Sequence, residues 1–231
     1  MTTTQYLADW RPYPFEITET RLEFDLAPRA TRVRSQIDFQ RIGPGDLALD
    51  GAGLRTLSIL IDGQPLDLAC LPAEGAQLLI PAADLPERFT FQSEVEIDPE
   101  ANTALEGLYL SGGMFCTQCE AEGFRHITWY PDRPDVMAPF QVTINSDMPV
   151  LLSNGNPVSA APGRAVWQDP WKKPAYLFAL VAGDLRAISD SFITMSGRKV
   201  ALNVWVRPGD EPRAGYALES LIRSMRWDEQ V

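Results

Sequence analysis

The chain has 231 residues, of which 45% are hydrophobic and 22% are charged, a balance typical of a folded globular protein. Its formal net charge of −11 disfavours nucleic acid and anionic membrane surfaces as partners. It lacks a signal-peptide pattern, the roughly 20 consecutive apolar residues of a membrane helix and the even cysteine count of a disulfide framework, so we expect a cytoplasmic protein.

The first predicted strand changes its alternation midway. Its apolar residues lie at odd positions at first, with Phe15 and Ile17, and at even positions later, with Leu22 and Phe24. Successive side chains of a strand point to opposite faces, so this change would turn the later residues away from the core. We therefore expect a bulge or a break between Ile17 and Leu22.

Further strands follow at regular intervals. Apolar and polar residues alternate over 32–40 and 89–97, with a serine at one position of each apolar series, the pattern of half-buried strands. The apolar alternation of 57–61 leads into the Asp-Gly pair at 62–63, which is a strong signal for a tight hairpin turn. With 19 prolines and 16 glycines between short strands, the sequence predicts a mainly β protein with an antiparallel β-sandwich or saddle-like domain.

The sequence changes character near its C-terminus. One more alternating strand covers 200–206, and apolar residues then recur at helical spacing over 214–225. This amphipathic helix needs a surface to cover. No glycine or proline stops it before the sequence ends, so we expect the chain to be part of a longer one.

Two motifs with reactive side chains have plain structural interpretations. Cys116 and Cys119 form a C-x-x-C pair, but a structural zinc site needs four ligands, and only the distant Cys70 and the lone His126 are left to supply them. A redox pair would want a βαβ context that this chain lacks. One histidine does not build a catalytic triad, so the residues alone indicate no catalytic and no metal-binding set.

A carboxylate pair follows the second of these cysteines. Glu120 and Glu122 precede the Gly-Phe-Arg run at 123–125. Two carboxylates at this spacing can serve as general acid and base, can bind a cation, or can simply be solvated. The residues alone leave these alternatives open.

Longer runs of the sequence resemble a known family. They are 102–109, 116–128 with a Gln-x-Glu motif, 129–135, 152–156 and 167–184. Together they resemble the amino-terminal domain of the aminopeptidase N family, bacterial zinc metallo-aminopeptidases of the gluzincin class.

The resemblance implies a division into two parts. Residues 1–190 correspond to the N-terminal β domain of the family, and 191–231 correspond to one strand and one helix at the truncated start of a thermolysin-like catalytic domain. The family's Gly-x-Met-Glu-Asn and H-E-x-x-H motifs do not occur in this sequence. The implied zinc therefore belongs to the full-length parent, while this fragment binds no zinc and is inactive.

The resemblance also assigns two substrate-binding residues. In the family, the glutamate of the Gln-x-Glu motif holds the α-ammonium of the peptide substrate, and the glutamine lines the pocket for its first side chain. These positions match Glu120 and Gln118. The implied partners are a peptide with a free amino terminus and the missing catalytic domain. The alternative is a non-enzymatic β-sandwich interaction module that shares only the family fold.

Overall fold

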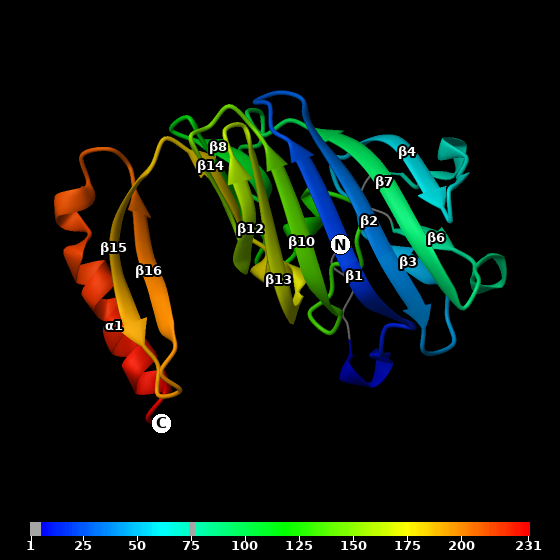
Figure 1. The fold of residues 1–231 in the computed structure, drawn as a ribbon. Coiled ribbons are helices and arrows are strands. Elements are labelled where there is room, and N and C mark those ends of the chain that lie inside the picture. The colour runs from blue at the N-terminus through cyan, green and yellow to red at the C-terminus, as the bar shows by residue number, and fades with distance from the viewer. Residues whose placement is uncertain (1–5, 74–76) are drawn as a thin grey trace. The chain divides into compact units, whose positions relative to one another are not determined.

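The computed structural model describes residues 6–73 and 77–231 (Figure 1). Residues 1–5, which belong to the segment inspected for a signal peptide, lie outside this description. The chain divides into two compact units. The first contains residues up to Asp147 together with Leu151–Ala182, and the second contains Met148–Val150 and Gly183–Val231.

An eight-stranded sheet dominates the first unit, with the strand order β12-β13-β10-β1-β2-β7-β4-β5 (Figure 1). Its strands are β1 (Phe15–Asp25), β2 (Thr31–Arg41), β4 (Arg55–Ile61), β5 (Gln64–Pro65), β7 (Arg88–Ile97), β10 (Met137–Asn145), β12 (Asn156–Ala161) and β13 (Arg164–Pro174). One pair departs from the antiparallel expectation, because β1 runs parallel to β10. Many residues separate these two strands in the sequence, which gives the chain the length that a parallel connection requires.

Smaller elements complete the unit. A four-stranded sheet has the order β11-β14-β9-β8, and β3 pairs with β6. Their bounds are β3 (Leu47–Leu49), β6 (Leu78–Ile80), β8 (Gly107–Ser111), β9 (Met114–Gln118), β11 (Val150–Ser153) and β14 (Leu180–Gly183), and the short 3₁₀ helices are η1 (Leu7–Asp9), η2 (Leu68–Cys70), η3 (Ala82–Asp84), η4 (Phe124–His126) and η5 (Ala175–Leu177). The prediction of a mainly β, sandwich or saddle-like domain is confirmed.

Two local predictions are also confirmed. The pairing of β1 with β2 shifts its register between Ile17 and Glu19, which is the bulge that the change of alternation requires. The β4–β5 hairpin turns at Asp62 and Gly63, whose φ angles of 50° and 77° are both left-handed, as a type I′ turn demands.

The core lies on one face of the large sheet. Along β2 and β7, every second side chain is buried, as in a sheet with one face against a core. Phe124 is fully buried in this core. Its ring centroid lies 4.8 Å from that of Tyr130, 5.2 Å from that of Phe178 and 6.0 Å from that of Phe140. This cluster fixes the segment that follows β9 against the sheet.

The second unit is a hairpin with a helix. The strands β15 (Arg186–Ile193) and β16 (Lys199–Val206) pair antiparallel, and η6 (Glu211–Arg213) leads into α1 (Gly215–Asp228). The predicted strand and helix are both present, and β15 adds a second strand that spans the expected boundary at 190. The assignment of this unit to a catalytic domain stays a prediction.

The apolar stripe of α1 faces the hairpin of its own unit. Contacts join α1 to β15 and β16. Leu218, Ile222 and Met225 on the helix are half-buried, and Phe192 and Leu202 of the hairpin are buried. No helix among the described residues is long and apolar enough to cross a membrane.

Candidate functional site

A tight turn follows β9 and carries the Gln-x-Glu motif. The turn runs from Cys119 to Gly123 and is closed where the backbone N–H of Gly123 donates to the carbonyl oxygen of Cys119 at 2.8 Å. The peptide bond between Glu120 and Ala121 is cis. A β-carbon at position 123 would lie 2.4 Å from the Gln118 carbonyl oxygen, so only glycine fits there.

The two predicted substrate-binding residues lie together on this turn. Both side chains are exposed, and Nε2 of Gln118 donates to the carbonyl oxygen of Glu120 at 3.3 Å. The Glu120 carboxylate makes no hydrogen bond or ion pair with any residue in the described ranges 6–73 and 77–231. It is therefore an uncommitted negative charge on a closed turn.

Glu122 has a different environment although it is only two residues away. Its Oε2 lies 3.4 Å from Nη1 of Arg125, and its side chain is 71% exposed. Solvent screens an ion pair this exposed, so the pair contributes little to stability. Of the two carboxylates, only Glu120 is without a cationic partner in the described structure.

Arg125 donates hydrogen bonds to the buried carboxylate of Asp132. Oδ2 of Asp132 accepts hydrogen bonds from both the backbone N–H and the Nε–H of Arg125, each at 3.1 Å, and the Asp132 carbonyl oxygen accepts one from Nη2 at 3.3 Å. Asp132 is only 5% exposed. Burial raises the pKa of its carboxyl, hydrogen bonds from Arg125 oppose that shift, and the nearby charge of Asp50 adds to it.

Asp132 is itself fastened to a distant segment. Its backbone N–H donates to Oδ2 of Asp50 at 3.0 Å, and Asp50 pairs through its own backbone with Tyr130. Nothing in the alternation or spacing of the sequence indicates this arrangement. The only available signal is that Asp132 belongs to the Asp-Arg-Pro-Asp run at 132–135, beside buried aromatic residues.

The remaining candidate residues have structural surroundings. Cys119, the first residue of the turn, is buried, and burial, followed by the charge of Asp132, raises the pKa of its thiol to about 12. The three cysteines, all within the described residues, form no disulfide bond. Nε2 of His126 lies 3.3 Å from Oε2 of Glu106. Among the residues that the structure describes, no three His, Cys, Asp or Glu side chains form a group that could hold a metal ion.

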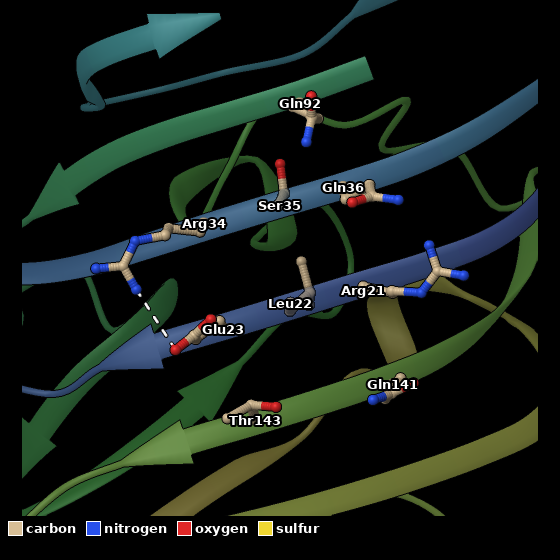
Figure 2. A pocket seen from close by; sticks show the side chains of 9 residues that line it. All are labelled: Arg21, Leu22, Glu23, Arg34, Ser35, Gln36, Gln92, Gln141 and Thr143. Atoms are coloured by element: carbon tan, nitrogen blue, oxygen red, sulfur yellow. Dashed lines mark ion pairs between the residues drawn. The ribbon is translucent and has the colours of Figure 1, made fainter. Parts of the chain in front are cut away.

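A second polar region lies on the outer face of the large sheet (Figure 2). There a depression of about 300 Å³ is lined by a row of side chains that crosses four strands, namely Gln92, Gln36, Arg21 and Gln141. Its charges are paired across the strands. Nη1 of Arg34 lies 3.5 Å from Oε1 of Glu23, and its Nη2 lies 2.6 Å from Oδ2 of Asp25. Nη1 of Arg21 lies 3.3 Å from Oδ2 of Asp38. Both arginines of the depression are therefore engaged by carboxylates of the same sheet.

Comparison with known proteins gives consistent matches. The model of the peptidase M1 N-terminal domain matches residues 32–177. Aminopeptidase N of Caulobacter vibrioides is 54% identical over 97% of this chain, and aminopeptidase N of Escherichia coli is 48% identical over 98% of it. In both cases the match covers 27% of the relative.

A solved structure matches equally widely. The crystal structure of Legionella pneumophila aminopeptidase A in complex with aspartic acid superimposes with a TM-score of 0.88 at 30% identity, over 98% of this chain and 28% of that one. The chain thus spans about a quarter of the length of each of these three proteins.

Proposed function

The chain belongs to the family defined by the peptidase M1 N-terminal domain, and from this premise we propose that it is the substrate-anchoring domain of a zinc aminopeptidase. Such an enzyme hydrolyses the bond after the first residue of a peptide. The names of the relatives, which are aminopeptidases, support the reaction class. The activity belongs to the full-length protein, and the 231 residues supply one side of its substrate site.

The observation that carries the proposal is the state of Glu120. An exposed carboxylate with no partner among the described residues can accept the charged hydrogen bonds of an α-ammonium group without first breaking an ion pair. The turn is closed at Gly123 and packed through Phe124, so the domain sets the backbone position from which the Glu120 side chain extends.

A fixed carboxylate explains how such an enzyme counts residues from the chain end. When Glu120 holds the ammonium group, the first peptide bond lies at a set distance from it, and cleavage falls after one residue. In the same proposal, Gln118 lines the space for the side chain of that first residue. Its amide is already turned toward the Glu120 main chain by their hydrogen bond.

In this proposal, zinc and the reacting groups belong to another part of the full-length protein. The described residues do not fit a zinc site, since they contain no cluster of three possible ligands. The proposal therefore assigns the metal and the general base to a catalytic domain outside these residues. What the present residues do is bind and orient the amino terminus of the substrate.

The test is Glu120→Gln in the full-length protein. The substitution keeps size and one acceptor but removes the charge. We expect kcat/KM for an aminoacyl anilide to fall about ten- to a hundredfold. This corresponds to a loss of about 1.5–3 kcal/mol of transition-state stabilisation. Substrates with a blocked amino terminus should lose little further, because they bring no ammonium group.

Glu122→Gln is the matched control. It removes an equal charge two residues away from Glu120, and that charge belongs to an exposed ion pair that solvent screens. It should change kcat/KM by less than about twofold. If Glu120→Gln stayed within twofold of wild type for the free-amine substrate, the anchoring role would belong to another residue.

A further inference from the structure

The Arg125–Asp132 pair lies where the turn that carries Glu120 meets the buried interior. We propose that Asp132, acting through Arg125, is a positioning residue that holds the Glu120 turn in its binding geometry. The inference rests on the proposed anchoring function of Glu120 and adds to it a residue that does not touch the substrate.

The first step is the strength of the attachment. One carboxylate oxygen of Asp132 receives both the main chain and the side chain of Arg125, each at 3.1 Å. Because one acceptor binds both the backbone N–H and the side-chain N–H of Arg125, it fixes the orientation of η4 as well as its position. Charge-assisted hydrogen bonds in a buried setting are the strong ones.

The second step is the attachment of Asp132 itself. Its backbone N–H is held at 3.0 Å by the Asp50 carboxylate, and Asp50 exchanges backbone hydrogen bonds with Tyr130 at 2.8 and 3.1 Å. The backbone N–H of Ala52 also donates to the carbonyl oxygen of Arg125 at 3.0 Å. Residues 124–132 are thus tied to the segment 50–52 at both ends.

The third step connects η4 to the turn. Gly123 immediately precedes Phe124, and its carbonyl oxygen accepts the N–H of His126 at 3.1 Å. Its own N–H closes the turn at Cys119, so Glu120 lies inside a loop whose closing residue belongs to the η4 structure. A shift of η4 therefore moves Gly123 and alters the position of Glu120.

Electrostatics points the same way. Nε and Nη2 of Arg125 are both occupied by Asp132, so the guanidinium charge is used inside the domain. Nη1 lies 3.4 Å from Oε2 of the exposed Glu122, so without the Asp132 charge only this screened contact would hold Arg125, and the guanidinium would lose its fixed orientation.

The experiment is a double-mutant cycle in the full-length protein with Asp132→Asn, Glu120→Gln and the combination of both. For an aminoacyl anilide with a free amine, Asp132→Asn should raise KM by at least about threefold while kcat changes less. In the Glu120→Gln background, the same substitution should raise KM by less than about twofold, because no anchor remains to be positioned. Hydrogen exchange of residues 119–126 should accelerate in Asp132→Asn relative to β2.

Asp169→Asn supplies a control for a purely structural effect. Asp169 forms a comparably enclosed ion pair with Lys173 at 3.0 Å, and their side chains are 13% and 10% exposed. This variant should lower the Tm but leave KM unchanged. If Asp132→Asn does not fold, Arg125→Lys keeps the charge and loses the two-pronged geometry, and it should give the same dependence on Glu120.

The outcomes separate the two proposals. If Glu120→Gln has no effect, the anchoring function and this inference both fail. If Glu120→Gln raises KM but Asp132→Asn does not, or if the Asp132→Asn effect is undiminished in the Glu120→Gln background, only the positioning role of Asp132 is wrong. An equal rise of KM in Asp169→Asn would likewise reduce Asp132 to a general stability residue.

Discussion

Two polar regions of the first unit use their charges in opposite ways. On the outer face of the large sheet, Arg34 and its neighbours are half-exposed and pair with carboxylates across the strands (Figure 2). After β9, a buried Asp132 takes up the charge of Arg125, while Glu120 is exposed without a partner among the described residues. The arginines of the outer face are thus paired within the sheet, whereas the turn after β9 presents a carboxylate that no described residue pairs. This difference favours the turn over the sheet face as the functional surface.

The largest expected effect concerns the support of the turn. Phe124→Ala would empty a fully buried site in contact with three other aromatic rings and should lower the free energy of unfolding by about 3–5 kcal/mol. Trp171→Ala, at a side chain that is 78% exposed, should change it by less than about 0.5 kcal/mol. Urea unfolding measures both, and equal losses would show that the turn is not anchored through its aromatic cluster.

The thiol reactivities of the buried Cys119 and the exposed Cys70 test how firmly the turn is packed. Raising the pKa of Cys119 from 9.0 to about 12 lowers its thiolate fraction about a thousandfold at neutral pH, and burial restricts access further. Native protein treated with a thiol reagent and analysed by mass spectrometry should therefore be labelled at the exposed Cys70 long before Cys119. In urea, both should react. Rapid native labelling of Cys119 would mean that the turn opens readily.

The pH dependence of stability should reveal the buried carboxylate. Because the pKa of Asp132 is raised in the folded state, its contribution to stability is complete below the unfolded value of 3.8 and is lost as pH rises through the folded value. The stability difference between wild type and Asp132→Asn should thus be largest at low pH and narrow with rising pH. Urea titrations at several pH values check this direction, and a difference that widens with pH would contradict it.

The smallest effect is expected on the outer sheet face. Arg34→Gln removes one cation from half-exposed pairs and should cost less than about 1 kcal/mol in unfolding free energy. In the full-length protein, kcat/KM should stay within about twofold of wild type. A large loss of activity would instead favour the outer face as a binding surface. It would also support the alternative hypothesis that the domain is an interaction module.

Much of the fold could be predicted because its signals are local. The alternation of apolar residues predicts β2 and β7, the Asp-Gly pair predicts the β4–β5 turn, and the change of parity predicts the bulge in β1. The helical spacing near the C-terminus predicts α1. Each of these depends on the conformational preferences of residues that are near one another in the chain. The pairing of Gln118 with Glu120 within one motif is local in the same sense.

Tertiary structure alone decided the rest. The parallel partnership of β1 with β10 and the contact of Asp50 with Asp132 join residues far apart in the sequence. No periodic pattern encodes which distant segments meet, because packing of the whole core selects them. The sequence by itself placed two similar carboxylates at Glu120 and Glu122. Only the folded structure decided that Arg125 lies beside both Glu122 and the buried Asp132, while Glu120 has no cationic partner among the described residues.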